Sequence, residues 1–487
     1  MLKKIISASV VYTMLSFFQP LLSLLLQPIY LNWFSNEDYA LFSLMNSYSS
    51  FVTLISALGI GGGVFTFYYD YHHNKEELDR YIGNVLTFCI WTIGIFSLLI
   101  FPFGNFLFSI LFTNNDSILF YPYGAIATIG GISAAIVTPF IVFLRNGNNL
   151  FAYVTLILIT ALGGFIGQLV FIVLFKAGIT GALWGKTIGS VFGATLVIVK
   201  NRKQLFWKPD WSYLKNTLEF MKFSTPASVF AWMYMYVDRF LIERMLNMLL
   251  LSVYSLLHVL TSTIELASYA VKNAITPFVF AKLKESETEG TPVNNISIYR
   301  FYYLFIVLFA STVVVVVTNI HWLTSNIYYH SIATYVFLYA SGYIIGSLIE
   351  IGNIYIYYEK KSPKLLMYGL FSISLNVGLN IFLVPVYQLW GVVLASFFAR
   401  FFTFFAYFIP HRKLLRIFFT RRELALFLLV FMVFAIAHWA TVFQFISIGN
   451  VGIIQFFIVA IIIISLNRSI PVQVYRFLNS MINFRMQ

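Results

Sequence analysis

Long runs of apolar residues, joined by short polar segments, constrain this chain more than any other feature of its sequence. Each run is close to or longer than the roughly 20 residues that cross a bilayer as a helix. The lipid interior offers the backbone no hydrogen-bonding partner, so only helices and closed barrels can cross it. Because the runs lack the period-two alternation of strands, they predict helices. The sequence therefore predicts an all-α polytopic membrane protein.

We expect about fourteen transmembrane helices. Their predicted ranges are 5–31, 40–68, 82–112, 119–144, 151–175, 181–199, 224–246, 250–280, 299–320, 332–357, 366–385, 391–409, 424–443 and 451–467. Only 10% of the 487 residues are charged and 60% are hydrophobic, whereas soluble proteins carry about 25% charged residues. This composition excludes a soluble enzyme. It also makes a membrane a better explanation of the net charge of +13 than a nucleic-acid partner.

The distribution of Lys and Arg predicts the orientation of the helices. Most of the 31 basic residues fall in every second connection, on the same side as the N-terminus. Basic connections stay in the cytoplasm, so both termini are expected there, in a multi-pass protein of the cytoplasmic (inner) membrane. The apolar stretch after Lys3 and Lys4 has no small-residue cleavage site before polar residues, and we interpret it as a retained first span.

The longest connection divides the predicted helices into two sets. It covers 201–222, is basic, and is expected to be a cytoplasmic linker that lies at the membrane surface. An N-terminal lobe of six helices (1–200) precedes it and a C-terminal lobe of six helices (223–410) follows it. Two further helices and a cytoplasmic tail complete the chain (411–487). Since six is even, the two lobes would be related by an axis along the membrane normal.

Ionisable side chains inside spans mark candidate functional positions, because each costs about 2.5–3.5 kcal/mol at a helix centre. His258, Glu265 and Lys272 follow one another at intervals of seven in the predicted helix 250–280. Seven residues return to nearly the same face of a helix, so the three form one stripe. The stripe either lines a water-accessible cavity or forms a buried ladder that pairs with helix 224–246.

Helix 224–246 has a second polar face. Trp232, Tyr236 and Arg239 lie on one side of it, where the aromatic rings can flank the guanidinium. Asp238 points about 100° away. The Asp238–Arg239 pair is therefore interpreted either as a clamp between helices or as part of a transport site.

Three more ionisable side chains lie in other predicted spans. Lys186 lies one or two turns inside the outer end of its span, where it either snorkels to the surface or faces a cavity. Arg400 lies near mid-span and has less freedom to snorkel. Glu350 is equally compatible with proton coupling and with a simple salt bridge. The sequence has no P-loop motif and no Cys/His cluster, so it predicts no nucleotide or metal cofactor.

Two segments resemble the Wzx-type polysaccharide flippases of the MOP exporter superfamily. The first is QPIYLNWFSNEDYALFSL (27–44), followed by a Gly-rich stretch at 59–63. The second is STPASVFAWMYMYVDRF (224–240), in which Pro226 opens a helix and an Asp-Arg-Phe motif lies toward its end. The superfamily also holds the multidrug and toxic-compound (MATE) extruders and the lipid II flippases.

The resemblance implies a MATE-like fold of two six-helix lobes around a cavity that opens alternately to either side. It implies an undecaprenyl-pyrophosphate-linked oligosaccharide as substrate, for O-antigen, capsule or teichoic-type polysaccharide, moved from the inner to the outer leaflet. A cationic cavity suits the pyrophosphate. The implied substrate contacts are Lys186, Arg239, Lys272, Arg400, Trp232, Tyr236 and His258. The implied coupling residues for H⁺ or Na⁺ are Asp238, Glu265 and Glu350.

The resemblance also implies partners. These are the membrane lipid and the polysaccharide polymerase with its chain-length machinery, with no nucleic acid. Many polysaccharide flippases have twelve helices, so the last two predicted here are additional. The first span lacks both the basic residue expected of a lipid II flippase and the acidic residue typical of drug extruders.

Two alternatives remain. A drug or metabolite antiporter of the same superfamily is disfavoured by a cationic cavity, because extruded drugs are often cations. A membrane-embedded polysaccharide polymerase or acyltransferase is disfavoured by the short predicted outer loops, which leave little room for catalytic residues.

Overall fold

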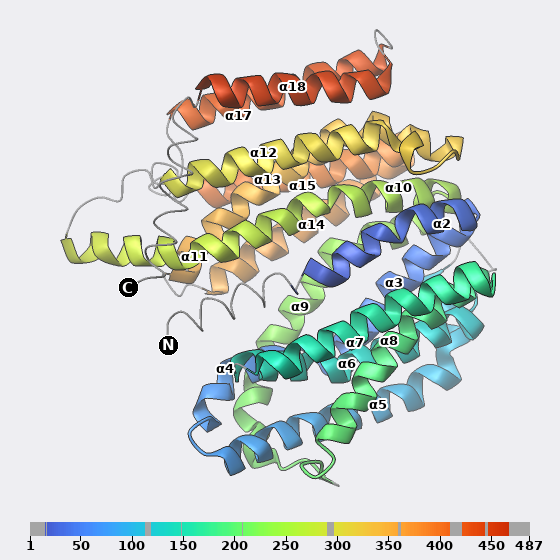
Figure 1. Cartoon of the computed structure of the whole chain (residues 1–487), viewed down its shortest axis with the longest axis vertical. Helices are drawn as coiled ribbons and strands as arrows, with labels where there is room; N and C mark the ends of the chain where they lie inside the picture. The colour runs from blue at the N-terminus through green and yellow to red at the C-terminus, as the bar shows by residue number, and fades with distance from the viewer. Residues whose placement is uncertain are drawn as a thin grey trace. The chain divides into compact units, whose positions relative to one another are not determined.

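The computed structural model describes residues 15, 17–112, 118–147, 149–206, 208–289, 297–358, 362–409, 421–443 and 447–466. These residues form helices and short turns, with no strand among them (Figure 1). Within this described part of the chain, eleven helices are long and apolar enough to cross a membrane. Each of the fourteen predicted spans coincides with a helical segment as far as its residues are described; residues 5–14, 16 and 467 of these spans lie outside the described residues. The predicted fold class is therefore confirmed, and the count of fourteen is consistent with the structure.

The chain divides into two compact units at Ser252 and Val253. The N-terminal unit contains α2 (Gln27–Trp33), α3 (Asn36–Ala57), α4 (Ile60–Tyr71), α5 (Lys75–Leu111), α6 (Ala125–Asn146), α7 (Leu150–Leu169), α8 (Gly178–Lys200) and α9 (Trp211–Met245). Helix α10 (Met248–Thr261) spans the division. The C-terminal unit continues with α11 (Thr263–Glu289), α12 (Ser297–Thr318), α13 (Ile332–Tyr358), α14 (Ser362–Tyr387), α15 (Leu389–Phe408), α17 (Arg421–Val442) and α18 (Ile448–Leu466).

Two predicted spans are each built from two helices. The predicted span 40–68 is interrupted between α3 and α4, where Leu58 and Gly59 both have left-handed backbone conformations (φ 46° and 67°). A left-handed residue cannot continue a right-handed helix. The Thr225 hydroxyl of α9 donates a hydrogen bond to the Leu58 carbonyl, 2.5 Å away, and so satisfies a group that the break exposes. The predicted span 250–280 is interrupted at Ser262, between α10 and α11.

Helix α9 begins earlier than predicted. Residues 201–222 were predicted to form a linker, but the helix begins at Trp211. The preceding residue, Asp210, accepts hydrogen bonds from the Ser212 amide and hydroxyl (2.9 and 2.7 Å). Thr217 is buried within its first turns and is 3.0 Å from the Tyr81 hydroxyl of α5. Through such contacts α9 belongs to the N-terminal unit, whereas the predicted C-terminal lobe began at 223. The predicted lobe boundaries stay a prediction.

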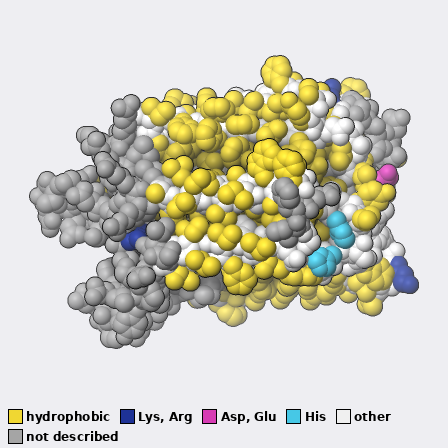
Figure 2. Space-filling model, turned by 90° about the horizontal axis from the view of Figure 1, so that it is seen from above, with side chains coloured by type: hydrophobic (Ala, Val, Ile, Leu, Met, Phe, Trp, Pro, Cys, Tyr) yellow, Lys and Arg dark blue, Asp and Glu magenta, His cyan; other side chains and the backbone are white. Residues whose placement is uncertain are grey.

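The surface agrees with a lipid environment. Figure 2 shows a face on which hydrophobic side chains predominate, while the few Lys, Arg, Asp and Glu side chains in view lie toward opposite edges. Large apolar side chains such as Leu98 of α5 and Phe382 of α14 are about three-quarters exposed. In water such contiguous exposure would cause aggregation. In a membrane these side chains contact acyl chains.

Glycines bring α7 and α8 together (Figure 1). Gly164 and Gly167 of α7 face Gly185 and Gly189 of α8. A Cβ atom added to Gly167 would lie 2.7 Å from the Gly185 carbonyl oxygen. Small residues allow this close backbone approach in membrane helices, and the pair forms one wall beside α6 of the N-terminal unit.

We predict that Gly185→Ala lowers the unfolding temperature of the purified protein. The new Cβ would collide with backbone atoms of Gly167 and Gln168, which cannot move aside as a side chain can. Overpacking of this kind costs about 1–3 kcal/mol. The matched control is Gly94→Ala on α5, where an added Cβ meets nothing within 4 Å. Equal unfolding temperatures for the two variants would contradict the packing described for α7 and α8.

Candidate functional site

The polar face of α3 contacts polar side chains of two other helices in the N-terminal unit. Ser43, Asn46 and Ser47 occupy adjacent turns of this helix. Asn46 contacts α8, while Ser43 and Ser47 contact α9. An amide or hydroxyl side chain costs less to bury than a charge and can hydrogen-bond to one. These residues can therefore form hydrogen bonds with the cationic side chains that α8 and α9 place inside the unit.

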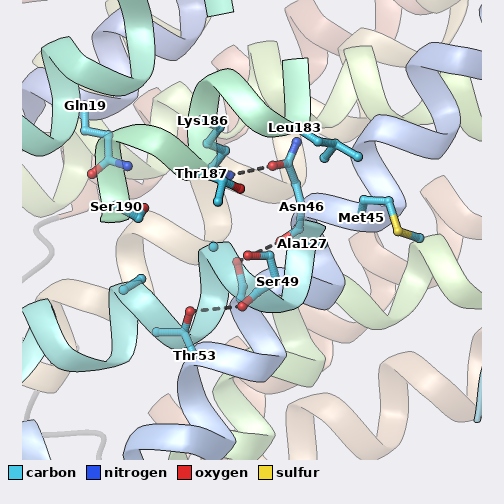
Figure 3. A pocket seen from close by; sticks show the side chains of 13 residues that line it. Gln19, Met45, Asn46, Ser49, Thr53, Ala127, Leu183, Lys186, Thr187 and Ser190 are labelled. Atoms are coloured by element: carbon cyan, nitrogen blue, oxygen red, sulfur yellow. Dashed lines mark hydrogen bonds between the residues drawn. The ribbon is translucent and has the colours of Figure 1, made fainter. Parts of the chain in front are cut away.

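Lys186 lines a cavity of about 150 Å³ between α3, α6 and α8 (Figure 3). Its Nζ donates a hydrogen bond to Asn46 Oδ1, 2.5 Å away. The other polar residues that line the cavity are Gln19, Ser49, Ser50, Thr53, Thr187 and Ser190. None of the 13 lining residues is Asp or Glu, so Lys186 gives the cavity a positive charge. Of the two interpretations of Lys186, the structure favours the cavity over snorkelling.

Arg239 fastens α9 to α3. Its Nε donates to Ser43 Oγ (2.9 Å) and its Nη1 to the Met235 carbonyl (3.0 Å), and only 4% of the residue is exposed. The guanidinium lies 5.2 Å from the centre of the Tyr236 ring, as the spacing of the two residues predicted. Trp232 adds a hydrogen bond from Nε1 to the Ser47 carbonyl (3.2 Å). These contacts support a clamp between helices.

Asp238 is also buried in this region, with 6% of the residue exposed. It lies on α9 next to Arg239 and within the N-terminal unit. The role of Asp238 in ion coupling stays a prediction.

The stripe on α10 and α11 faces α13 and α15 within the C-terminal unit. His258 lies at its start, where Nδ1 is 3.0 Å from the Tyr339 hydroxyl and 3.3 Å from the Tyr343 hydroxyl. The Tyr254 hydroxyl is 3.0 Å from that of Tyr339, which extends the network by one turn of α10. Beyond the interruption at Ser262, Lys272 also contacts α13, through Glu350, and Glu265 lies within electrostatic range of Glu350 and of Arg400.

Arg400 of α15 lies against the tyrosines of α13. Its guanidinium carbon is 4.2 Å from the centre of the Tyr343 ring and 5.9 Å from that of Tyr339, and 7% of the residue is exposed. Its Cδ lies over Gly342 and Gly346, 3.6 Å from where a Cβ atom on either glycine would lie. Cation–π contacts stabilise a desolvated guanidinium by about 2 kcal/mol.

Lys272 and Glu350 form an ion pair at the other end of the stripe. Lys272 Nζ is 2.6 Å from Glu350 Oε2, and the exposed fractions of the two side chains are 14% and 19%. Asn353 donates a hydrogen bond to the second carboxylate oxygen (3.1 Å), and the ammonium lies 4.4 Å from the Tyr269 ring centre. Glu265 lies within electrostatic range of this pair and of Arg400. The salt bridge considered for Glu350 is therefore present.

The structure thus sorts the predicted site residues into two groups. Lys186, Trp232, Tyr236, Asp238 and Arg239 lie in the N-terminal unit, and His258, Glu265, Lys272, Glu350 and Arg400 lie in the C-terminal unit. Among the described residues, no group of three or more His, Cys, Asp or Glu side chains could hold a metal ion.

The neutral partners of these ionisable side chains were not predicted from the sequence. Asn46, Ser43, Tyr339 and Tyr343 contact Lys186, Arg239, His258 and Arg400. A signal was available, because polar residues recur along one side of the apolar segment 43–53, at a spacing typical of a helix face.

We predict that Lys272→Met and Glu350→Gln each destabilise the protein. Each leaves a charged or strongly polar partner without its counter-ion, at a cost between the roughly 1 kcal/mol of an exposed pair and the roughly 3–5 kcal/mol of a buried pair. The double variant should lose less stability than the sum of the single losses. Thermal unfolding of all four proteins measures this coupling. Simple additivity would contradict the ion pair.

Comparisons with known proteins now bear on the fold. No protein-family model matches the sequence, and no curated protein matches it. A solved structure described as the lipid II flippase MurJ in an inward closed conformation covers 94% of this chain and 99% of its own, with a TM-score of 0.64 and 14% sequence identity. An inward-facing multidrug resistance MATE family transporter of the MOP superfamily covers 81% of this chain and 94% of its own (TM-score 0.58, 14% identity).

A third solved structure is a MOP superfamily transporter from Pyrococcus furiosus, whose binding pocket is described as reversed in polarity. It covers 85% of this chain and 96% of its own, with a TM-score of 0.52 and 14% identity. At this identity the likeness concerns the fold. The chain shares the fold of these three solved structures over nearly the full length of each of them.

Proposed function

We propose that this chain is a flippase of Wzx type. It moves an undecaprenyl-pyrophosphate-linked oligosaccharide from the inner to the outer leaflet of the cytoplasmic membrane, for the biosynthesis of cell-surface polysaccharide. It does so by alternating access, with both termini in the cytoplasm. The shared fold supports the proposal, since one structure with this fold is described as a lipid II flippase.

The cavity at Lys186 is the observation that carries the proposal. An ammonium that contacts an amide, among hydroxyl and amide side chains and without an acidic lining residue, attracts an anion. A pyrophosphate is such an anion, and the surrounding hydroxyls suit its oxygen atoms. A transporter of cationic drugs would need the opposite charge in its binding cavity.

The ion network of the C-terminal unit supports a coupled process. Lys272 and Arg400 are cations held beside Glu265 and Glu350, so the balance of charge there depends on whether each carboxyl holds a proton. We propose that Glu265, with Asp238 of α9 and Glu350, exchanges a proton or a sodium ion as access alternates. His258 then joins the cations in contacting the substrate.

The geometry supports a second role for two of the proposed substrate contacts. Arg239 and Trp232 donate hydrogen bonds to α3, so in the proposed cycle they transmit movement between helices as well as contact substrate with Tyr236. The polymerase and its chain-length machinery would receive the product at the outer surface.

Flipping in proteoliposomes tests the proposal. Purified protein is reconstituted with a fluorescent undecaprenyl-pyrophosphate oligosaccharide, and the fraction that dithionite quenches is followed with time. We predict that the native protein equilibrates the leaflets and that Lys186→Gln slows this about 10- to 100-fold at low substrate, because a charge-assisted hydrogen bond contributes about 1.5–3 kcal/mol. The matched control is Lys200→Gln, the same change at an exposed position on α8.

Two results would overturn the proposal. One is native protein that leaves the labelled lipid in its original leaflet under an imposed H⁺ or Na⁺ gradient. The other is gradient-driven uptake of ethidium by the same proteoliposomes without movement of the lipid, which would establish a drug antiporter of the same fold.

A further inference from the structure

The segment that connects α8 to the middle of α9 carries a concentration of exposed basic side chains. Residues 201–222 include five basic and two acidic residues, so their net charge is +3. All five basic side chains are exposed, and among the described residues none of them has an ion-pair partner. They are Arg202, Lys203, Lys208, Lys215 and Lys222. A surface with this balance of charge attracts anions.

The first turns of α9 have a buried face and a separate basic face. Leu214 and Met221 are seven residues apart and are buried in the N-terminal unit, with 0% and 5% of each residue exposed. Trp211, Lys215 and Lys222 follow one another at intervals of four and seven, which also places them on one face of the helix. All three are exposed. The helix is therefore amphipathic here, with an aromatic ring and two ammonium groups directed away from the unit.

Hydrogen bonds to α5 hold the loop that precedes α9. The Phe206 amide donates to Thr87 Oγ1 (3.1 Å). The Asp210 amide donates to Asn84 Oδ1 (2.6 Å). Both acceptors belong to the same face of α5, one turn apart. The loop is thus attached to the N-terminal unit at two points, and its basic side chains are presented from a fixed backbone.

Exposed apolar side chains show where this segment lies relative to the lipid. Val199, near the end of α8, is 55% exposed, and Phe223 of α9 is 76% exposed. Both are suited to acyl chains, so the residues between them lie at or beyond the edge of the hydrocarbon layer. Lys222 directly precedes Phe223, and Lys215 lies about 10 Å farther along the helix. A charged surface acts over roughly 8–10 Å in physiological salt, so both ammonium groups are within its range.

We propose that residues 201–222 bind the headgroups of anionic phospholipids in the cytoplasmic leaflet, with Trp211, Lys215 and Lys222 at the centre of this lipid-binding surface. The negative potential of that leaflet complements the charge of +3, and an amphipathic helix with exposed Lys and Trp side chains is typical of membrane interfaces. The choice of leaflet rests on the proposed orientation of the chain. The proposal is independent of the substrate that the protein moves.

The start of α5 provides an internal contrast. Lys75 and Arg80 are exposed there, but Glu76, Glu77 and Asp79 lie between them in the chain. Residues 75–80 therefore have a net charge of −1. We expect no binding of anionic headgroups at this position, although it lies in the same unit and also has two exposed cations.

Titration with soluble phospholipids tests the proposal. The full-length protein in a neutral detergent is titrated with dioctanoyl phosphatidylglycerol, and with dioctanoyl phosphatidylcholine for comparison, and binding is measured by calorimetry. The native protein should bind phosphatidylglycerol more tightly. The double variant Lys215→Gln/Lys222→Gln should bind it about 10- to 30-fold more weakly, since each basic residue near a lipid surface contributes about fivefold. The matched double variant Lys75→Gln/Arg80→Gln removes the same charge and should bind it as the native protein does.

A change of the opposite sign gives an independent measurement. Glu219 is exposed on α9, one turn from Lys215 and from Lys222, and reduces the charge of the lipid-binding surface. Glu219→Gln should therefore tighten the binding of phosphatidylglycerol about fivefold. The double variant Lys215→Arg/Lys222→Arg keeps both charges and should bind as the native protein does. Unfolding temperatures without lipid identify any variant that no longer folds, in which case these two variants decide the result.

Three results would overturn the proposal. The first is equal binding of phosphatidylglycerol and phosphatidylcholine by the native protein. The second is an equal loss in the α9 and α5 double variants, which would show an effect of net charge without a defined surface. The third is binding of glycerol 3-phosphate as tight as that of dioctanoyl phosphatidylglycerol, which would assign the surface to soluble phosphate compounds. None of these outcomes depends on whether the protein flips a lipid-linked oligosaccharide, so the proposed function is tested separately.

Discussion

The free-energy cost of burying charged side chains between helices in a membrane determines which contacts form inside this protein. A charged side chain at the centre of a span is unfavourable by several kcal/mol unless a partner or water replaces its hydration. The buried ions whose contacts the structure gives meet that requirement through specific neighbours. Arg239 donates to a serine and a carbonyl, Lys272 pairs with Glu350, and Arg400 lies on two tyrosine rings. Because these contacts join different helices, they satisfy the buried charges and also hold the helices together.

The two units meet the cost in different ways, and the difference bears on function. In the C-terminal unit, carboxylates offset cations directly, so a change of protonation at Glu265 or Glu350 would disturb an existing balance. In the N-terminal unit, Lys186 meets an amide at the edge of a polar cavity that no acidic side chain lines. A neutral partner such as Asn46 accepts a hydrogen bond from the ammonium but does not neutralise its charge. A bound anion can neutralise that charge. The proposed division between a coupling network and an anion-binding cavity follows from this contrast.

Particular residues show how far the sequence could predict the site. The seven-residue spacing of His258, Glu265 and Lys272 predicted one stripe. In the structure His258 and Lys272 both contact α13, and Glu265 lies within electrostatic range of Glu350 on the same helix. The partner of Lys272 was not predictable, because Glu350 is 78 residues away and only packing brings it near. Likewise the three-residue spacing predicted the contact of Arg239 with Tyr236, but not that with Ser43. Periodicity fixes the face of a helix, whereas the neighbour of that face depends on how helices pack.

The sequence alone determined the solvent and the class of fold. Hydrophobic length and the scarcity of charge decide these, because they act residue by residue along the chain. Tertiary structure decided the rest: the interruptions at Leu58 and Ser262, the early start of α9, and the assembly of α3, α6 and α8 around Lys186. A cavity is the space left where small residues on separate helices meet, and no single stretch of sequence encodes it. Pairwise contact between distant segments, and not local preference, sets its charge and its size.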